Sequence, residues 1–254
     1  MKQKFVNTTN TRAFLSAVSA LQQRGAGEAC LMVIDGKPGL GKTFTVKSWS
    51  TDRLSVYIRV TKEVTPCWLM KMILEAMNKT PASSIFERLF KQVVEELKKA
   101  VELAQQSDED FAVIIDEVDN ICRSARILET LRDLSDLLEI PFIFVGMGQV
   151  RQNLVRFPQI ASRIGQYVTF APLTREDVRK LIDELCEVKV ADDLVEYLHK
   201  MSKGLAREIK EGIANIERFG RKNPPTGNGL TIKDMSGQIL MNDRDTGRPI
   251  IVRA

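Results

Sequence analysis

A run of nine residues, written DGKPGLGKT (35–43), combines three glycines with a lysine and a hydroxyl group at its end. Gly36 is followed, after four intervening residues, by Gly41-Lys42-Thr43, which is the spacing of a P-loop. Glycines let successive backbone N–H groups turn inward as a nest for phosphate oxygens, and a following helix adds its N-terminal partial charge. The pattern predicts that this loop binds the phosphates of ATP. The residues expected to contact the nucleotide are Gly36, Lys37, Pro38, Gly39, Leu40, Gly41, Lys42, Thr43 and Phe44.

Within this loop, Lys42 is expected to reach the β- and γ-phosphates, and Thr43 to ligate Mg²⁺. The segment FAVIIDEVDN (111–120) supplies the acids that such a site requires. Asp116 ends an apolar run and is expected to hold Mg²⁺ through its water shell, while Glu117 orients and deprotonates the attacking water as a general base. Two adjacent acids indicate hydrolysis rather than transfer to a substrate. Asp119 is interpreted as a surface or capping residue.

The elements that position these residues are predicted from apolar runs bounded by helix and strand breakers. Runs rich in Val, Ile and Phe without polar alternation are typical of strands buried on both faces of a parallel sheet. Such runs lie at 31–35, 55–60, 111–116, 141–146 and 166–171. Helical patterns between them predict a doubly wound α/β domain.

Two of these helices carry recognisable start signals. Thr65-Pro66 reads as an N-cap followed by a first-turn proline, with Trp68, Leu69, Met72, Ile73 and Ala76 facing a core. The sequence Ser84-Ile85-Phe86-Glu87 reads as a capping box that starts a long helix. Its expected apolar stripe consists of Phe86, Phe90, Val94, Leu97 and Val101.

After Pro172 the sequence pattern changes to three amphipathic helices, at 174–186, 191–202 and 204–219, without an intervening strand. We therefore expect an α/β nucleotide-binding domain at 1–172 and a small all-helical lid domain at 173–222. A loop at 222–229 is predicted from its composition. The remainder, within 223–254, is interpreted as a loop and tail whose contacts are left open.

Composition excludes several classes of protein. The N-terminus has no apolar core of a signal peptide, and no apolar run approaches a membrane span, so a cytoplasmic protein is expected. The four cysteines are dispersed, which favours buried thiols over a disulfide framework, and zinc has no plausible ligand set. The single histidine, His199, is interpreted as an ordinary helix residue.

Charge is unevenly distributed although the net charge is only +4. Residues 1–100 carry 16 basic against 8 acidic side chains, whereas residues 101–150 carry 3 against 11. Basic ends are compatible with a nucleic-acid partner. The segment RVTKEVT (59–65) brings Thr61, Lys62 and Thr65 to a helix N-terminus, where phosphate contacts to double-stranded DNA are expected. Arg218, Arg221 and Lys222 form a second, less specific basic cluster.

The order of these motifs, with a P-loop, Asp116-Glu117, a fourth strand and a helical lid, resembles that of AAA+ ATPases. The resemblance implies that Arg163 is an arginine finger acting on a neighbouring subunit's nucleotide, with Arg156 as the alternative. It also implies that Arg207, in Gly204-Leu205-Ala206-Arg207, is a second sensor that contacts the nucleotide. The first sensor departs from the family pattern, because Met147 occupies its expected place and Gln149 is the polar residue nearby.

Within that family, the chain resembles the B protein of Mu-like transposing phages and the target-selecting ATPases of bacterial transposons. The matching segments are FVNTTNTRAFLSAVSAL, GKPGLGKT, LETLRDLSDLLEIPFIFVGMGQV and AREIKEGIANIERFGR. The resemblance implies that ATP-bound subunits form a homo-oligomer, a helical filament on double-stranded DNA, and deliver target DNA to a transposase. About thirty residues precede the first expected strand, so the N-terminal DNA-binding appendage of the phage Mu type is expected to be absent.

Two alternatives stay open from the sequence. A helicase loader or replication-initiator ATPase shares the same motifs and would differ in its protein partner. A nucleotide-gated protein-binding switch without DNA would use the same P-loop, although the basic surplus at both ends argues against it.

Overall fold

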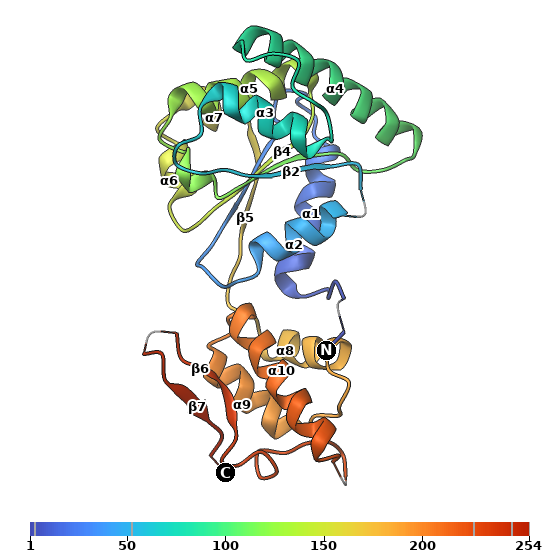
Figure 1. Ribbon diagram of the computed structural model, residues 1–254, viewed down its shortest axis with the longest axis vertical. Helices are drawn as coiled ribbons and strands as arrows, with labels where there is room; N and C mark the ends of the chain where they lie inside the picture. The colour runs from blue at the N-terminus through green and yellow to red at the C-terminus, as the bar shows by residue number, and fades with distance from the viewer. Residues whose placement is uncertain (3, 52, 226, 245, 254) are drawn as a thin grey trace. The chain divides into compact units, whose positions relative to one another are not determined.

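The computed structural model describes every residue except 3, 52, 226, 245 and 254, and Figure 1 labels most of its helices and strands. Residue 226, within the loop predicted at 222–229, therefore lies outside the described residues. The chain divides into two compact units, which are considered separately. The larger comprises Ala13–Lys37 and Lys42–Phe170, and the smaller comprises Met1–Arg12, Pro38–Gly41 and Ala171–Ala254.

The larger unit is built on a five-stranded parallel sheet, which confirms the predicted α/β fold. Its strands are β1 (Leu31–Asp35), β2 (Val56–Arg59), β3 (Val113–Asp116), β4 (Phe142–Val145) and β5 (Ile164–Thr169), in the order β2-β3-β4-β1-β5. The residues of β3 and β4 are all buried, as expected for interior strands, whereas the edge strand β5 alternates between less and more exposed residues. Because the strands are parallel, the loops after β1, β2, β3 and β4 all leave from one edge of the sheet.

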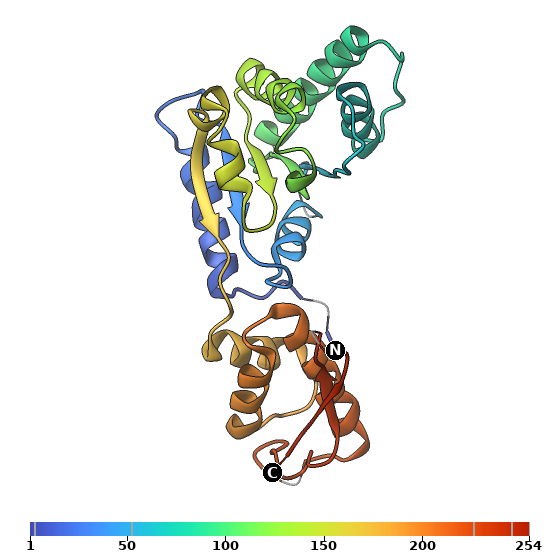
Figure 2. The same cartoon turned by 90° about the vertical axis from the view of Figure 1, so that its left-hand side faces the viewer.

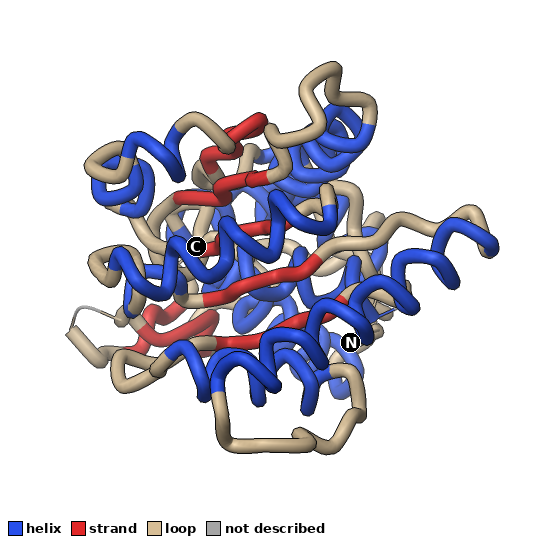
Figure 3. The backbone as a smooth tube through the Cα atoms, turned by 90° about the horizontal axis from the view of Figure 1, so that it is seen from above, coloured by secondary structure: helices blue, strands red, loops and turns tan. Residues whose placement is uncertain are grey.

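Helices lie on both faces of this sheet (Figures 1 and 3). They are α1 (Thr9–Gln22), α2 (Lys42–Thr51), α3 (Pro66–Ala76), α4 (Phe86–Gln106), α5 (Ala125–Leu138), α6 (Val150–Leu154) and α7 (Pro158–Ala161), with a 3₁₀ turn η1 (Val118–Asn120). The main core packs α3, α4 and α5 against alternate sheet residues such as Val33, Ile58 and Ile115. Elsewhere Phe14 of α1 meets Trp49 of α2 edge to face, with ring centroids 5.6 Å apart.

The predicted start of α3 is confirmed, because the Thr65 hydroxyl oxygen accepts a hydrogen bond from the Trp68 backbone N–H and Pro66 occupies the first turn. The predicted buried face is only partly right. Leu69 and Ile73 are buried, but Trp68 is 43% exposed and Ala76 is also exposed. The helix is therefore rotated so that Met70 and Leu74 complete its buried face.

The capping box expected at Ser84–Glu87 is wrong. Helix α4 begins one residue later than that pattern implies, with Ile85 as an N-cap that makes no side-chain hydrogen bond. Glu87 instead pairs with Lys91 one turn further along (2.7 Å), so its carboxylate is not available to cap the helix start. The stripe is also centred elsewhere: Leu89, Val93 and Leu97 are buried, while Phe86, Phe90, Val94 and Val101 are only partly buried against the core.

The smaller unit contains the three predicted lid helices, α8 (Arg175–Leu185), α9 (Asp192–Ser202) and α10 (Ala206–Lys222). Thr174 and Asp177 form a capping box at the start of α8. Asp177 also accepts hydrogen bonds from the backbone N–H (2.8 Å) and the hydroxyl (3.1 Å) of Thr9, which fixes the N-terminal segment to this unit. His199 is a residue of α9, as predicted, and its Nε2 lies 3.0 Å from the Leu173 carbonyl oxygen.

The C-terminal segment, interpreted from the sequence as a loop and tail with its contacts left open, contains a β-hairpin. Strands β6 (Ile239–Asn242) and β7 (Pro249–Ile251) pair antiparallel, as both ribbon views show (Figures 1 and 2). Leu240, Met241 and Val252 are almost completely buried in the core that α8, α9 and α10 share. The tail is thus ordered because it contributes apolar side chains to the helical core.

Two expectations from composition can be compared with the described residues. All four cysteines are free, and three of them, Cys30, Cys122 and Cys186, are buried, as predicted. Among the helices formed by the described residues, none combines the length and the apolar character that crossing a bilayer requires.

We predict that Leu240→Ala lowers the free energy of unfolding by about 2–5 kcal/mol, because it removes a completely buried side chain and leaves a cavity. The measurement is urea unfolding followed by circular dichroism. The neighbouring Ile239→Ala is the matched control, since Ile239 is 52% exposed and its loss is expected to change stability by well under 1 kcal/mol. Equal effects of both substitutions would contradict the placement of the hairpin in the core.

Candidate nucleotide site

The P-loop follows β1 and leads into α2, as the motif requires. Gly36, Gly39 and Gly41 have φ values of 146°, 85° and 90°. Side chains with a Cβ rarely adopt these conformations, so the three glycines are the residues that let this backbone turn inward on itself. The sequence-predicted residues Gly36–Thr43 therefore form one continuous turn between strand and helix, with backbone N–H groups available to an anion.

Lys42 opens α2 and is only 7% exposed. Its Nζ donates hydrogen bonds to the carbonyl oxygens of Gly36 (2.6 Å) and Lys37 (2.9 Å). Burial lowers the pKa of the Lys42 ammonium, and the charges of Asp35, Asp119 and Asp116 oppose that shift. A buried ammonium whose present partners are neutral carbonyls is well suited to a phosphate, which offers charged oxygens in their place.

The remaining loop residues differ in what they can offer to a ligand. The side chain of Leu40 is 3% exposed, so it contributes packing, and only its backbone is available. Lys37 and Pro38 are exposed, as are Thr43 and Phe44 in the first turn of α2. Phe44 is an exposed large apolar side chain beside a phosphate loop (46%), which suits contact with the base or sugar of a nucleotide.

Asp116 is the last residue of β3 and is 2% exposed. Its Oδ2 accepts a hydrogen bond from the Tyr57 hydroxyl (2.7 Å), and its Oδ1 accepts one from the Glu117 backbone N–H (2.9 Å). Burial raises the pKa of the Tyr57 phenol, and the hydrogen bond and charge of Asp116 raise it further. Asp116 is therefore held as a buried carboxylate by two donors.

The donor set fits Mg²⁺, which prefers oxygen ligands and commonly takes only one or two from the protein, with waters and phosphates completing its shell. Thr43 and Asp116 are the protein oxygens that the sequence assigns to it. Among the described residues, no group of three or more His, Cys, Asp or Glu side chains gathers into a metal site. The chemistry of this site thus favours a metal bound together with phosphate.

Glu117 adopts the left-handed conformation (φ 58°), which is uncommon for a residue with a Cβ and is often found at functional sites. Its carboxylate pairs with the guanidinium of Arg59, the last residue of β2. The hydrogen bond to Glu117 raises the pKa of Arg59. The sequence did not indicate this pair, which places an arginine on the carboxylate expected to act as general base.

The interpretation of Asp119 as a surface or capping residue is wrong. Its Oδ2 accepts a hydrogen bond from the Met147 backbone N–H (2.7 Å), and burial raises the pKa of its carboxyl group. The 3₁₀ turn η1 carries Asp119 back toward the end of β4. A Cβ at Gly146 would lie only 2.7 Å from Asp119 Oδ2, so only a glycine fits beside this carboxylate. The glycine that follows β4 was therefore the sequence feature that could have indicated the contact.

The residues considered for the first sensor lie after β4. Met147 is 46% exposed, and its backbone, not its side chain, contacts Asp119. Gln149 is the exposed N-cap residue of α6 and makes no side-chain capping bond. Gln149 as first sensor stays a prediction.

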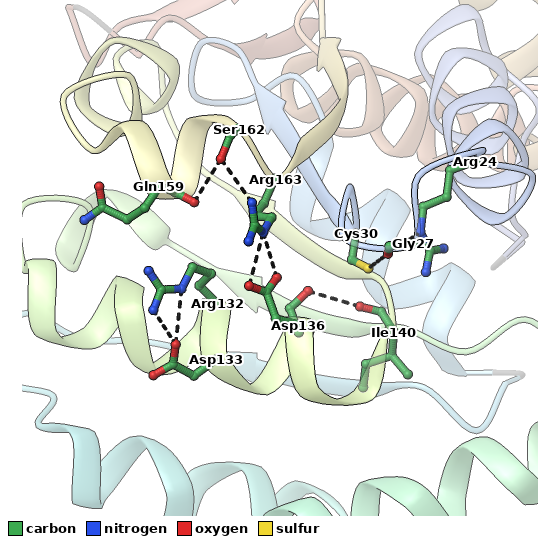
Figure 4. A network of polar contacts seen from close by, with 11 residues as sticks. Arg24, Gly27, Cys30, Arg132, Asp133, Asp136, Ile140, Gln159, Ser162 and Arg163 are labelled. Carbon is green, nitrogen blue, oxygen red and sulfur yellow. Dashed lines mark hydrogen bonds and ion pairs between the residues drawn. The ribbon is translucent and has the colours of Figure 1, made fainter.

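Arg163 precedes β5, at the amino edge of the sheet, whereas Lys42 and Asp116 lie at the carboxyl edge. Its Nε donates to both carboxylate oxygens of Asp136 in α5 (2.9 and 3.1 Å), as Figure 4 shows. Asp136 raises the pKa of Arg163. The alternative, Arg156, is exposed between α6 and α7. Arg163 and Lys42 are thus at opposite edges of the same sheet.

Arg207 is the second residue of α10, and its side chain is exposed. Its backbone N–H donates to the Gly39 carbonyl oxygen (3.1 Å), so the start of α10 contacts the tip of the P-loop within the smaller unit. Within the smaller unit, the structure therefore brings together the loop tip Pro38–Gly41 and the helix turn that carries the predicted second sensor.

The predicted DNA-contact segment directly follows Arg59. Thr61 and Lys62 are exposed, and the Thr65 hydroxyl oxygen is occupied as the N-cap of α3. In the second basic cluster, Arg221 forms ion pairs with Glu187 (2.6 Å) and with Glu217. The side chains of Arg218 and Lys222 are exposed.

A family model described as an AAA domain matches residues 25–154, more than half of the 254-residue chain. The chain is also similar to a potential ATP-binding protein of Staphylococcus aureus, with 30% identity over 116 residues. That similarity covers 42% of this chain and 42% of the relative, so less than half of the relative's length is matched.

Solved structures extend the comparison to the fold. The Aeropyrum pernix ORC2 protein in its ADP form has a TM-score of 0.61 and 15% identity, over 89% of this chain and 68% of that one. The Aeropyrum pernix ORC1 protein, solved in complex with DNA, has a TM-score of 0.58 and 14% identity, over 87% of this chain and 62% of that one. At such identities the similarity concerns the fold.

We predict that Lys42→Ala abolishes nucleotide binding, because it removes the buried cation that faces the loop carbonyls. The measurement is binding of a fluorescent ADP or ATP by anisotropy, with an expected weakening of at least about a hundredfold, which corresponds to about 2.8 kcal/mol. Lys98→Ala, an exposed lysine of α4, is the matched control and is expected to bind like wild type. Unchanged affinity for Lys42→Ala would refute the phosphate site.

Proposed function

We propose, because the chain belongs to the AAA domain family, that it is an ATP-hydrolysing protein that binds double-stranded DNA, oligomerises on it and delivers it to a transposase. The P-loop and the acids that follow β3 support the ATPase part of this proposal. The transposition part rests on the resemblance of the segment 5–21, the P-loop, the segment 128–150 and the segment 206–221 of α10 to the B protein of Mu-like phages.

In this proposal the backbone N–H groups of the P-loop hold the phosphates, and Lys42 exchanges its carbonyl partners for phosphate oxygens. Thr43 and Asp116 hold Mg²⁺. When bound, Mg²⁺ neutralises phosphate charge that develops during hydrolysis. Glu117 accepts the proton of the attacking water, and Arg207, at the start of α10, contacts the nucleotide of its own subunit.

The observation that carries the proposed link between DNA binding and ATP hydrolysis is the ion pair between Arg59 and Glu117. Arg59 ends β2, and the segment 60–65 continues from it. The Val60 backbone N–H donates to the Asp116 carbonyl oxygen (3.0 Å), and its own carbonyl oxygen accepts from Asn120 Nδ2 (3.0 Å). A displacement of this segment therefore acts on the strand end that holds Arg59 against Glu117.

We infer that DNA acts through this segment. Lys62 is exposed and carries its charge next to the N-terminus of α3, which suits a phosphate oxygen. Thr61 offers a hydroxyl group. Thr65 accepts from Trp68 and keeps its own hydroxyl proton for donation. Phosphate contact at Lys62 would draw Arg59 away from Glu117, so that hydrolysis accelerates on DNA. Such contacts carry no base information, and binding is expected to be sequence-tolerant.

Oligomerisation is proposed from the position of Arg163. Because it lies at the amino edge of the sheet, its guanidinium is remote from the Lys42 side of its own sheet. An arginine there can serve catalysis only on the nucleotide of another subunit, where it would stabilise negative charge on the γ-phosphate. This role would require a homo-oligomer, consistent with assembly as a filament on DNA.

A second candidate function is that of a helicase loader or replication initiator. Its support is the fold similarity to the Aeropyrum pernix ORC1 protein, which was solved in complex with DNA. The two candidates share ATP and DNA and differ in the protein partner. Retention of a replicative helicase, rather than a transposase, by the ATP-bound protein would favour the second candidate.

We predict that Arg59→Ala raises ATP hydrolysis without DNA severalfold and reduces the stimulation by DNA, because Glu117 loses its ionic partner. The measurement is steady-state phosphate release with and without random-sequence duplex. Arg88→Ala, an exposed arginine of α4, serves as the matched control and should behave like wild type. If Arg59→Ala hydrolysed ATP more slowly than wild type and kept full stimulation by DNA, this arginine would not restrain the base.

The proposal as a whole is tested with Glu117→Gln, which should bind ATP and hydrolyse it about 10²–10⁴-fold more slowly, trapping the ATP-bound form. We expect it to shift duplex DNA in gels with ATP and not with ADP, and to form filaments or rings by negative-stain microscopy. Nucleotide-dependent assembly that ignores DNA would instead identify a protein-binding switch.

On the same background, Lys62→Ala should weaken DNA binding across all sequences and reduce the slope of log affinity against log salt by about one. Lys98→Ala, an exposed lysine of α4, is the matched control. A salt series for Lys62→Ala that superimposes on that of the parent would remove Lys62 from the DNA contact.

A further inference from the structure

A buried carboxylate that none of the roles above uses lies in the first turn of α10. Glu208 is 7% exposed. Its Oε1 accepts a hydrogen bond from Arg244 Nε (3.1 Å), but its Oε2 has no hydrogen-bond partner among the described residues. Burying a carboxylate oxygen without a hydrogen-bond partner costs free energy, so its presence at this position needs a physical explanation.

The unpartnered oxygen faces the tip of the P-loop. A Cβ built on Gly39 would lie 3.6 Å from Glu208 Oε2, at ordinary van der Waals distance. The backbone at this place is fixed, since the Gly39 carbonyl oxygen accepts from the N–H of Arg207, the residue before Glu208. All of these groups belong to the smaller unit. A negative charge therefore stands directly beside the loop expected to receive phosphates.

The charge of Glu208 is offset by the C-terminal hairpin. Arg244 lies in the connection between β6 and β7, and its Nη2 also donates a hydrogen bond to Glu211 Oε2 (3.2 Å). Glu211 Oε1 in turn accepts from the Asn242 backbone N–H (3.3 Å) at the end of β6. Arg244 is thus held between two acids of α10, and its side chain remains 54% exposed. Among the described residues, Arg244 is the basic residue that forms a salt bridge with Glu208.

We propose that Arg244 is a positioning residue of the nucleotide site, which acts through Glu208 to set the affinity of the P-loop for phosphates. This inference rests on the proposed nucleotide-binding function. With Arg244 in place, the carboxylate beside Gly39 is neutralised and phosphates bind. When Arg244 is withdrawn, an uncompensated negative charge lies beside the tip of the P-loop, and nucleotide affinity falls.

The test is a double-mutant cycle read out by the dissociation constant of fluorescent ADP and ATP. We expect Arg244→Ala to weaken binding about tenfold and Glu208→Gln to bind as tightly as wild type or more tightly. The decisive variant combines both substitutions, and its affinity should return to within about twofold of Glu208→Gln, because the carboxylate that repels phosphate is gone. Arg244→Lys keeps the positive charge and should stay near wild type.

Arg248→Ala is the matched control, since Arg248 is the other exposed arginine of the hairpin region and should leave affinity unchanged. Urea unfolding of each variant identifies any that fails to fold. If Arg244→Ala binds nucleotide like wild type, or if the double variant is as weak as Arg244→Ala alone, the inference is wrong. Failure of the proposed function is distinguishable, because wild type would then bind no better than Lys42→Ala.

Discussion

The buried ammonium group of Lys42 is the charge on which the arrangement of the larger unit depends. It is buried, and two hydrogen bonds to the carbonyl oxygens of Gly36 and Lys37, together with the nearby carboxylates of Asp35, Asp116 and Asp119, offset the lost hydration. Bringing these acids to one place requires β1 and β3 to end at the same edge of the sheet, which a parallel sheet provides. The direct hydrogen-bond partners of the ammonium group are neutral carbonyl oxygens, which suits an exchange of these partners for the charged oxygens of a phosphate.

Each of the three acids at the end of β3 and just after it is in turn restrained by a group from a neighbouring strand or from the residues that follow it. The Tyr57 hydroxyl holds Asp116, Arg59 holds Glu117, and the Met147 backbone holds Asp119. Two of these three groups come from β2, the strand that continues into the segment expected to contact DNA. The acids of the nucleotide site and the segment expected to contact DNA are thus connected through β2. For this reason ATP hydrolysis and DNA binding are proposed as coupled activities.

The parts of this account that the sequence could predict are those determined by local backbone requirements. The P-loop glycines, the Thr65 cap and the apolar strands are each dictated by a few adjacent residues. The missed features depend on contacts that are distant in the chain. Glu117 meets Arg59 across 58 residues, and no spacing rule connects them. The hairpin is ordered by the burial of Leu240 and Met241 against α10, although its strands have only four and three residues. The Ser84 cap was wrong because the helix begins after Ile85, whose backbone N–H donates to the hydroxyl oxygen of Ser83.

The central claim is that the nucleotide site and the DNA-contact segment are energetically coupled. Coupling is reciprocal, so DNA must change ATP affinity by the same factor by which ATP changes DNA affinity. The most direct measurement is the dissociation constant of a non-hydrolysable ATP analogue for the wild-type protein by calorimetry, with and without saturating random-sequence duplex. We predict that duplex DNA tightens ATP binding at least fivefold and leaves ADP binding unchanged. Identical ATP affinities in the two conditions would contradict the account.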